Sequence, residues 1–176
     1  MKVGIAGVGG IGSNVAVNLV RAGVDSFLLV DFDRVEPSNL NRQFYFADQL
    51  GRPKVDVLRE NLLRIAPAAE IETRQLRLEP ANMVETFAGC DVLVEGFDDQ
   101  ASKKQLIEAF AGSGLPIVSA SGIAGRGLGS IRVHRLGNCT IVGDFVSDFR
   151  ENTLYCPKIS IIAAMMADIV LQKVLP

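Results

Sequence analysis

The sequence predicts an α/β fold with a mostly parallel sheet, helices on both faces and a small antiparallel extension. Three observations support this prediction. Short apolar runs alternate with segments of helical periodicity as far as Ala120. A glycine-rich turn joins the first apolar run to the first helical segment, which is typical of Rossmann-like proteins. After Gly129, apolar and polar residues alternate, as on a half-exposed antiparallel strand.

The N-terminal residues are expected to form a β-α-β unit. Lys2–Ala6 is a short apolar run that leads into glycines, which suits a buried strand. Ile11–Ala22 carries Val15 and Leu19 at a helical spacing. Phe27–Val30 is a second apolar run, and because a helix joins the two strands they should lie parallel.

A long polar segment follows this unit. Asp33–Leu50 is irregular and too long for a simple connection in a compact domain, so we expect it to be functional. Beyond it, periodicity predicts helices over Lys54–Ile65, Asn82–Phe87, Ser102–Ala111 and Lys158–Val174. Apolar runs predict strands over Ala69–Leu76, Asp91–Glu95 and Ile117–Ala120, and alternation predicts an antiparallel pair around Ile131 and over Ile141–Phe145.

Composition narrows the class of protein. The length of 176 residues predicts a single domain over residues 1–176. A formal net charge of -2 gives no basis for general nucleic-acid binding. The apolar stretch Ile159–Ala167 is too short to span a membrane. Cys90, Cys139 and Cys156 are far apart and form no CxxC pair, so we expect no zinc site, no disulfide framework and a reducing, cytoplasmic setting.

The glycine turn is the strongest local chemical signal. Glycines let the backbone approach a phosphate closely, and the N–H groups at a helix start favour anions. Asp31 closes the second strand, where a carboxylate can accept hydrogen bonds from both ribose hydroxyls. The turn and this aspartate predict a nucleotide site that would serve NAD and ATP equally, built from Gly7, Gly9, Gly10, Gly12 and Asp31.

Charged residues beyond the turn separate these two nucleotides. Asp98 and Asp99 follow a predicted strand and should lie at its C-terminal end, where open α/β sheets bind ligands. Arg42 and Lys54 could neutralise phosphate oxygens while a carboxylate holds Mg²⁺. This combination favours a triphosphate, although each charge taken alone also fits a solvated surface position.

Several runs of sequence resemble one family. GVGGIGSNVAVNLVRAGV, LLVDFDRVEPSNLNRQ and GRPKVDVLRENLLRIAP closely resemble the ThiF/MoeB/HesA family, which is related to ubiquitin-activating E1 enzymes. The similarity continues through CDVLVEGFDD, IVSASGIAG and the final helix, so it covers nearly the whole chain. The run SNLNRQFYF is most similar to small ThiF-type members associated with thiamine biosynthesis.

The resemblance implies roles for matching positions. Gly10 would contact phosphates, Asp31 would hold the ribose, and Asp98 would bind Mg²⁺. The residues of the loop and the next helix would line the triphosphate site, with Arg42 as the main phosphate contact and Lys54 as the second cation: Ser38, Asn39, Arg42, Gln43 and Lys54. We also expect Asp99 to bind the nucleotide. Arg42, Lys54 and Asp98 are the expected catalytic groups.

The family resemblance also implies an activity and partners. It implies an ATP-dependent adenylyltransferase, a nucleotidyltransferase that attaches AMP to the C-terminal carboxylate of a small ubiquitin-like sulfur-carrier protein of the ThiS type. A homodimer is expected. Many relatives bind zinc through two CxxC pairs that are absent here, and Cys156 could be an acyl acceptor or a small structural residue.

Three other interpretations stay open at this stage. An NAD-dependent oxidoreductase needs only the glycine turn and Asp31, but it leaves Arg42, Lys54 and Asp98 unexplained. An E1-like enzyme of a different kind would act instead on a small molecule or on a carboxylate attached to tRNA. A non-catalytic relative would bind a carrier protein without activating it.

Overall fold

A seven-stranded sheet forms the centre of the computed structural model, which describes residues 1–174. The strand order is β3-β2-β1-β4-β5-β7-β6, and all neighbours are parallel except β6 and β7. The strands are β1 Lys2–Ala6, β2 Ser26–Val30, β3 Glu70–Arg74, β4 Val92–Glu95, β5 Ile117–Ala120, β6 Arg132–Leu136 and β7 Cys139–Gly143. The predicted Rossmann-like α/β sheet with a small antiparallel extension is confirmed.

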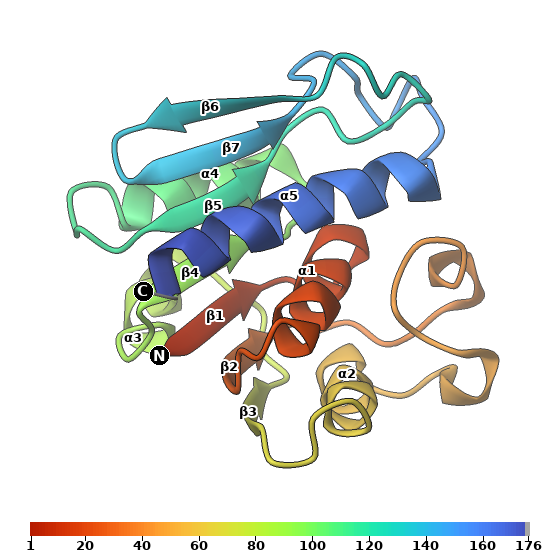
Figure 1. The fold of residues 1–176 in the computed structure, drawn as a ribbon, viewed down its shortest axis with the longest axis vertical. Helices are drawn as coiled ribbons and strands as arrows, with labels where there is room; N and C mark the ends of the chain where they lie inside the picture. The colour runs from red at the N-terminus through yellow and green to blue at the C-terminus, as the bar shows by residue number, and fades with distance from the viewer. Residues whose placement is uncertain (175–176) are drawn as a thin grey trace.

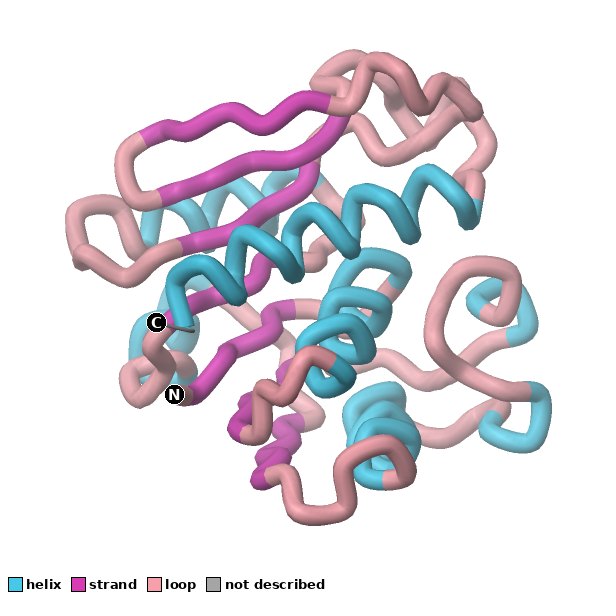
Figure 2. Tube along the Cα trace, in the orientation of Figure 1, coloured by secondary structure: helices cyan, strands magenta, loops and turns pink. Residues whose placement is uncertain are grey.

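Helices cover both faces of this sheet. On one face α1 and α5 pack side by side, and α2 lies next to them over β2 and β3 (Figure 1). On the other face α3 and α4 pack together (Figure 2). The bounds are α1 Gly10–Arg21, α2 Lys54–Leu63, α3 Pro80–Thr86, α4 Gln100–Ala109 and α5 Cys156–Val174, and two short 3₁₀ turns, Pro37–Asn39 and Ala47–Gln49, lie in the polar loop. In the part of the chain described by the structure, none of these helices has the length and apolar character needed to cross a membrane.

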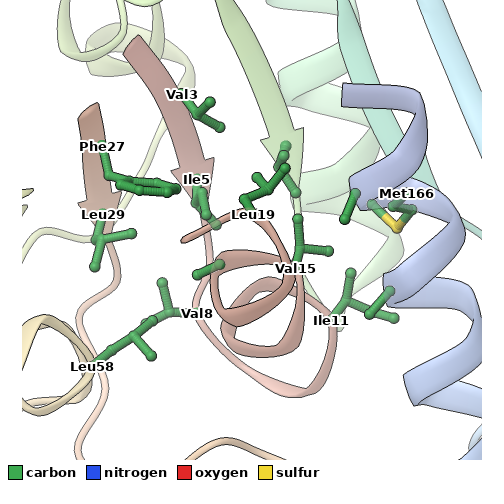
Figure 3. Close-up of a cluster of buried hydrophobic side chains, with 14 of the residues drawn as sticks. Val3, Ile5, Val8, Ile11, Val15, Leu19, Phe27, Leu29, Leu58 and Met166 are labelled. Carbon is green, nitrogen blue, oxygen red and sulfur yellow. The ribbon is translucent and has the colours of Figure 1, made fainter. Parts of the chain in front are cut away.

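The core fixes the N-terminal β-α-β unit. Val3 and Ile5 of β1 are fully buried, as are Val15 and Leu19 of α1 that face them (Figure 3). Met166 closes the same cluster from α5. Burying side chains of this size removes about 1.5–3 kcal/mol of unfavourable hydration each. The cluster therefore holds the C-terminal end of β1, from which the glycine turn emerges, in a rigid position.

Several element boundaries differ from the sequence prediction by a few residues, and the exposure of one strand differs as well. β3 stops at Arg74, because the chain then turns and Leu76 lines a cleft at the sheet edge. β6 pairs antiparallel to β7 as predicted, but all five of its residues are exposed, because none of the described helices packs over it. β7 ends at Gly143 and does not reach Phe145, whose φ of 63° is incompatible with an extended strand.

Candidate nucleotide site

A cleft of about 660 Å³ opens at the C-terminal ends of the central strands. β1 lies between β2 and β4 in the sheet, so the strand order reverses beside the cleft. Such a reversal is where open α/β sheets bind ligands. Nine of the predicted site residues line this cleft: Gly7, Gly9, Gly10, Asp31, Arg42, Gln43, Lys54, Asp98 and Asp99.

Two glycines make the turn between β1 and α1. Gly7 has a φ of +85°, a left-handed conformation that side-chain-bearing residues rarely adopt, and its N–H donates to the carbonyl of Val30 at 2.8 Å. At Gly12 an added Cβ would lie 1.9 Å from the Gly7 carbonyl oxygen. Gly12 does not line the cleft among the described residues, so its place in the motif is explained by close backbone packing.

Asp31 is held rigidly beside the turn. Its Oδ2 accepts the N–H of Val8 at 2.8 Å, and its Oδ1 accepts the N–H of Asp33 at 2.8 Å. Burial raises the pKa of Asp31, whereas these N–H groups and the charge of Lys54 act to lower it. Each carboxylate oxygen keeps a second lone pair, so the group can still accept hydrogen bonds from a ligand.

Lys54 lies at the start of α2 and is almost fully buried. Its Nζ lies 2.9 Å from Asp33 Oδ2, and only 7% of its side chain is exposed, against 46% for Asp33. Its backbone N–H also donates to the Asp33 carbonyl at 2.9 Å. A buried ammonium needs a partner, and Asp33 supplies it. Sequence reasoning did not single out Asp33, although the pattern Asp31-Phe32-Asp33 placed it two residues beyond the ribose aspartate.

Arg42, from the polar loop, lies against the glycine turn at Gly10. A Cβ built on Gly10 would lie 3.7 Å from Arg42 Cγ, so the glycine leaves room for the arginine stem. The guanidinium donates to the Ser38 carbonyl at 2.8 Å and to Asn41 Oδ1 at 2.7 Å. Partial burial lowers the pKa of Arg42, and the opposite charge of Asp98 partly offsets this. Arg42 and Asp98 therefore lie close enough in the cleft for their opposite charges to attract.

Ser38 and Asn39 occupy a different position from the one expected. Within residues 1–174 neither lines the cleft. Asn39 is buried, and its Oδ1 accepts the N–H of Glu36 at 3.0 Å. The Ser38 carbonyl accepts the Arg42 hydrogen bond. In this structure both residues shape the loop that presents Arg42.

The loop after β4 carries Asp98 and Asp99 into the cleft. Asp99 caps α4, because its Oδ1 accepts the N–H of Ser102 at 2.8 Å. The loop is anchored by Glu95, a fully buried carboxylate whose Oε1 accepts the N–H of Phe97 at 2.7 Å. Glu95 also pairs with Lys103 of α4 and accepts the hydroxyl of Ser119 of β5 at 2.5 Å. This network was not predicted, although a glutamate at the end of an apolar strand indicates a buried carboxylate that needs partners.

A second buried ion pair supports the far wall of the cleft. Lys158 Nζ, with 1% of its side chain exposed, lies 2.6 Å from Asp144 Oδ2 and donates to the Ala124 carbonyl at 2.5 Å. Asp144 Oδ1 accepts the N–H groups of Val146 and Ser147. Burial tends to raise the pKa of Asp144, but Lys158 and these N–H groups outweigh it and lower the value to about 2. The segment after Asp144 is thereby fixed where Ser147 lines the cleft.

The cysteines lie away from this chemistry. Cys90 and Cys139 are buried, and burial raises the pKa of each thiol to about 11. Cys156 is exposed at the start of α5, 3.8 Å from the hydroxyl of Ser160, and does not line the cleft among the described residues. Residues 1–174 contain no group of three metal-ligating His, Cys, Asp or Glu side chains.

Sequence comparison finds relatives of this chain in one protein family. The model of the ThiF family matches residues 1–175. The molybdopterin-synthase adenylyltransferase of Haemophilus influenzae is 30% identical over 166 residues, which are 94% of this chain and 68% of the relative. The adenylyltransferase and sulfurtransferase UBA4 of Yarrowia lipolytica is 31% identical over 138 residues, 78% of this chain but 35% of the relative.

Solved structures show the same fold. The Escherichia coli tRNA N6-threonylcarbamoyladenosine dehydratase TcdA, crystallised with ATP, superposes with a TM-score of 0.86 at 20% identity, over 98% of this chain and 86% of that one.

The chain spans about a third of the length of the curated relatives UBA4 and MoeZ (35% and 31%), so it matches one portion of those larger proteins. On the match over nearly its whole length, the chain belongs to the ThiF family.

Proposed function

We propose that this protein is an adenylyltransferase that uses ATP and Mg²⁺ to attach AMP to the C-terminal carboxylate of a ubiquitin-like sulfur-carrier protein. The observation that carries the proposal is the convergence of Arg42, Lys54 and Asp98 on a single cleft beside the glycine turn. A dinucleotide site needs less positive charge than this, which is why NAD chemistry is the weaker alternative. The relatives UBA4 and molybdopterin-synthase adenylyltransferase are both named as adenylyltransferases, which supports the same choice.

The geometry suggests how ATP would lie. Asp31 is fixed at the end of β2 with lone pairs available for the ribose hydroxyls. The glycine turn and the N-terminus of α1 would receive phosphates, since backbone N–H groups there attract anions. Arg42 lies against that turn, and Lys54 lines the same cleft from α2. Two cations near the phosphates would offset the repulsion between a triphosphate and an incoming carboxylate.

The reaction would need little from the side chains beyond positioning and charge. The carrier carboxylate attacks the α-phosphorus of ATP, a new phosphorus–oxygen bond forms, and pyrophosphate leaves with the electrons of the broken bond. No side-chain base is required, because a C-terminal carboxylate is already ionised at neutral pH. Arg42 and Lys54 would hold both anions in line and stabilise the charge that develops during transfer.

The carboxylates at the cleft fit a bound Mg²⁺. This ion prefers oxygen ligands and is commonly held by one or two carboxylates together with substrate phosphates and waters. Asp98 and Asp99 are both in the cleft lining. Asp99 already caps α4 through one oxygen, which leaves Asp98 as the main candidate ligand. When bound, Mg²⁺ would neutralise phosphate charge and favour the departure of pyrophosphate.

The finer assignments rest on sequence. The run SNLNRQFYF resembles small ThiF-type proteins, so a ThiS-like carrier and thiamine biosynthesis are the proposed context. Two relatives are instead named molybdopterin-synthase adenylyltransferases, so the test includes a carrier for molybdopterin synthesis as well. We also propose that residues 1–176 act as one adenylation domain, that the protein is a cytoplasmic homodimer, and that it binds neither zinc nor nucleic acid.

Pyrophosphate exchange tests the proposal. The protein, Mg²⁺ and ATP are incubated with labelled pyrophosphate and a ThiS-like or MoaD-like carrier, and label entering ATP is measured. Exchange that depends on the carrier and on its free C-terminus is expected. The matched control is Arg74→Ala, which removes an exposed cation outside the cleft, against Arg42→Ala, which removes one inside it. Equal exchange by these two variants would contradict the assignment of Arg42.

A further inference from the structure

A buried tyrosine of the polar loop contacts the backbone of the glycine turn. The hydroxyl of Tyr45 donates to the carbonyl oxygen of Val8 at 2.7 Å, and only 5% of this tyrosine is exposed. Its side chain belongs to the same core cluster as Val8 (Figure 3). A buried tyrosine hydroxyl needs a hydrogen-bond partner, and the Val8 carbonyl supplies it. The roles proposed for Arg42, Lys54 and Asp98 make no use of this contact.

We propose that Tyr45 is a positioning residue, which orients the peptide between Val8 and Gly9 so that the Gly9 N–H points into the cleft and donates to a phosphate of the nucleotide. This inference rests on the proposed function, because it assumes that a nucleotide occupies the cleft. It adds a residue outside the cleft lining that controls how the glycine turn meets the phosphates.

The geometry of a peptide bond carries the first step. The Val8 carbonyl and the Gly9 N–H belong to one planar peptide, and in a trans peptide they point in opposite directions. Tyr45 holds the carbonyl oxygen on the buried side, so the N–H faces away from the core. Gly9 lines the cleft, and among residues 1–174 no group accepts its N–H. A free N–H beside the N-terminus of α1 suits an anion.

The freedom of the flanking glycines explains why this peptide needs a support. Gly7 and Gly9 have no side chain to restrict rotation, so the peptide between Val8 and Gly9 can turn over at little cost. The Val8 N–H is held by Asp31 Oδ2 at 2.8 Å, but that bond fixes the preceding peptide. In the described part of the chain, the Tyr45 hydroxyl is the one donor to the Val8 carbonyl. A turned peptide would present this oxygen to the phosphates and repel them.

The hydroxyl is a constant donor in a fixed place. Burial raises the pKa of Tyr45 well above its ordinary value of 10.0, and the charges of Asp31 and Asp33 raise it further. The group therefore stays protonated at neutral pH. The loop is also attached to α1 beside the tyrosine, because the Phe44 N–H donates to Ser13 Oγ at 3.1 Å. Tyr45 thus reaches the turn from a backbone that is itself anchored.

Tyr45→Phe removes the hydroxyl and keeps the buried ring. Calorimetry measures the affinity of the full chain for ATP and for inorganic tripolyphosphate, which has the phosphates but no base. The variant should bind both probes about tenfold more weakly, the scale of a hydrogen bond to a charged group. The matched control is Tyr155→Phe, which removes the hydroxyl of a tyrosine that does not line the cleft among the described residues. It should bind both probes as the wild type does.

Nuclear magnetic resonance of the ¹⁵N-labelled protein observes the Gly9 amide itself. In the wild type its proton signal should move downfield as tripolyphosphate binds, because the N–H then donates to an anion. At saturation this movement should be largely lost in Tyr45→Phe and retained in Tyr155→Phe. A general loosening of the fold would not single out one amide in this way.

A second background separates the peptide from the arginine loop. Tyr45→Phe should weaken tripolyphosphate binding further when Arg42 is already replaced by alanine. If it does not, Tyr45 acts only by placing Arg42, and the inference is overturned. Unchanged affinities in Tyr45→Phe, or a Gly9 signal that moves as in the wild type, would overturn it too. A wild-type protein that binds no ATP would instead overturn the proposed function, and this inference with it.

Discussion

Replacing Lys158 with methionine should destabilise the protein through a single buried group. The ammonium is 1% exposed and contacts the Asp144 carboxylate, the Ala124 carbonyl and, at 3.4 Å, the hydroxyl of Ser147. Methionine has a similar length and fills the space, so the cost is mainly that of leaving the Asp144 charge unpaired. Breaking one side of a buried ion pair costs about 3–5 kcal/mol.

The lower end of that range applies here. Asp144 Oδ1 keeps its hydrogen bonds from the N–H groups of Val146 and Ser147 after the substitution. We therefore expect Lys158→Met to lower the free energy of unfolding by about 3 kcal/mol, or the melting temperature by roughly 6–12 °C for a chain of this size. Denaturant titration and thermal melting both measure this effect.

A double-mutant cycle separates the ion pair from general damage to the core. Asp144→Asn keeps an oxygen that can accept the two N–H groups but removes the charge. The loss of stability in the combined variant should be smaller than the sum of the two single losses by at least about 2 kcal/mol, because neither charge is then buried without a partner. If the two substitutions were strictly additive, or if Lys158→Met cost less than about 1 kcal/mol, the Lys158–Asp144 pair would not be the source of this stability.

Three further predictions concern the cleft and its supports. Arg42→Ala and Lys54→Ala should each lower the adenylation rate about 10²–10³-fold with the fold retained, as measured by pyrophosphate exchange; near-normal rates would remove both assignments. Gly12→Ala should abolish ATP binding and lower the melting temperature, because the new Cβ would lie 1.9 Å from the Gly7 carbonyl oxygen; normal binding by calorimetry would contradict this packing argument. Asp144 should make stability depend on acid: its pKa falls from 3.8 unfolded to about 2 folded, so its contribution is complete above about pH 4 and is lost as the pH falls towards 2. Asp144→Asn should flatten that part of the pH–stability curve, and an unchanged curve would count against the depressed pKa.

The parallel part of the fold was predictable because its signals are local. Apolar runs such as Ile117–Ala120 are buried strands, and the glycine turn marks where β1 becomes α1. Once the strands are parallel, their C-terminal ends share one edge, so Asp31 and Asp98 could be expected near each other from sequence order. Arg42 and Lys54 lie in the loop and the helix beyond β2, and the family resemblance was needed to assign them to the same site.

Other features depend on contacts between distant residues. The pairing of Lys158 with Asp144 and of Glu95 with Lys103 leaves no periodic trace in the sequence. The contact of the Arg77 guanidinium with the Phe32 ring joins residues that lie just beyond the ends of β3 and β2. The exposure of β6 was missed because alternation in a strand does not reveal whether a helix covers either of its faces.

Family motifs also carry residues whose individual jobs differ. Ser38 and Asn39 belong to the same loop sequence as Arg42, and the resemblance assigned all three to the triphosphate site. In the structure Arg42 lines the cleft, whereas the side chain of Asn39 stabilises the local turn by accepting the N–H of Glu36. The sequence alone could not distinguish a residue that would meet the ligand from one that positions its neighbour.

Mass spectrometry of the carrier protein can detect the proposed adenylation itself. A ThiS-like or MoaD-like protein with a free C-terminal carboxylate is incubated with this protein, ATP and Mg²⁺, and its intact mass is compared with that of the same carrier with a C-terminal amide. We expect one added AMP on the carrier with the free carboxylate, none on the amidated carrier, and little with Arg42→Ala. ATP binding without any AMP on the carriers tried, or AMP transfer that ignores the C-terminal carboxylate, would contradict the proposed function.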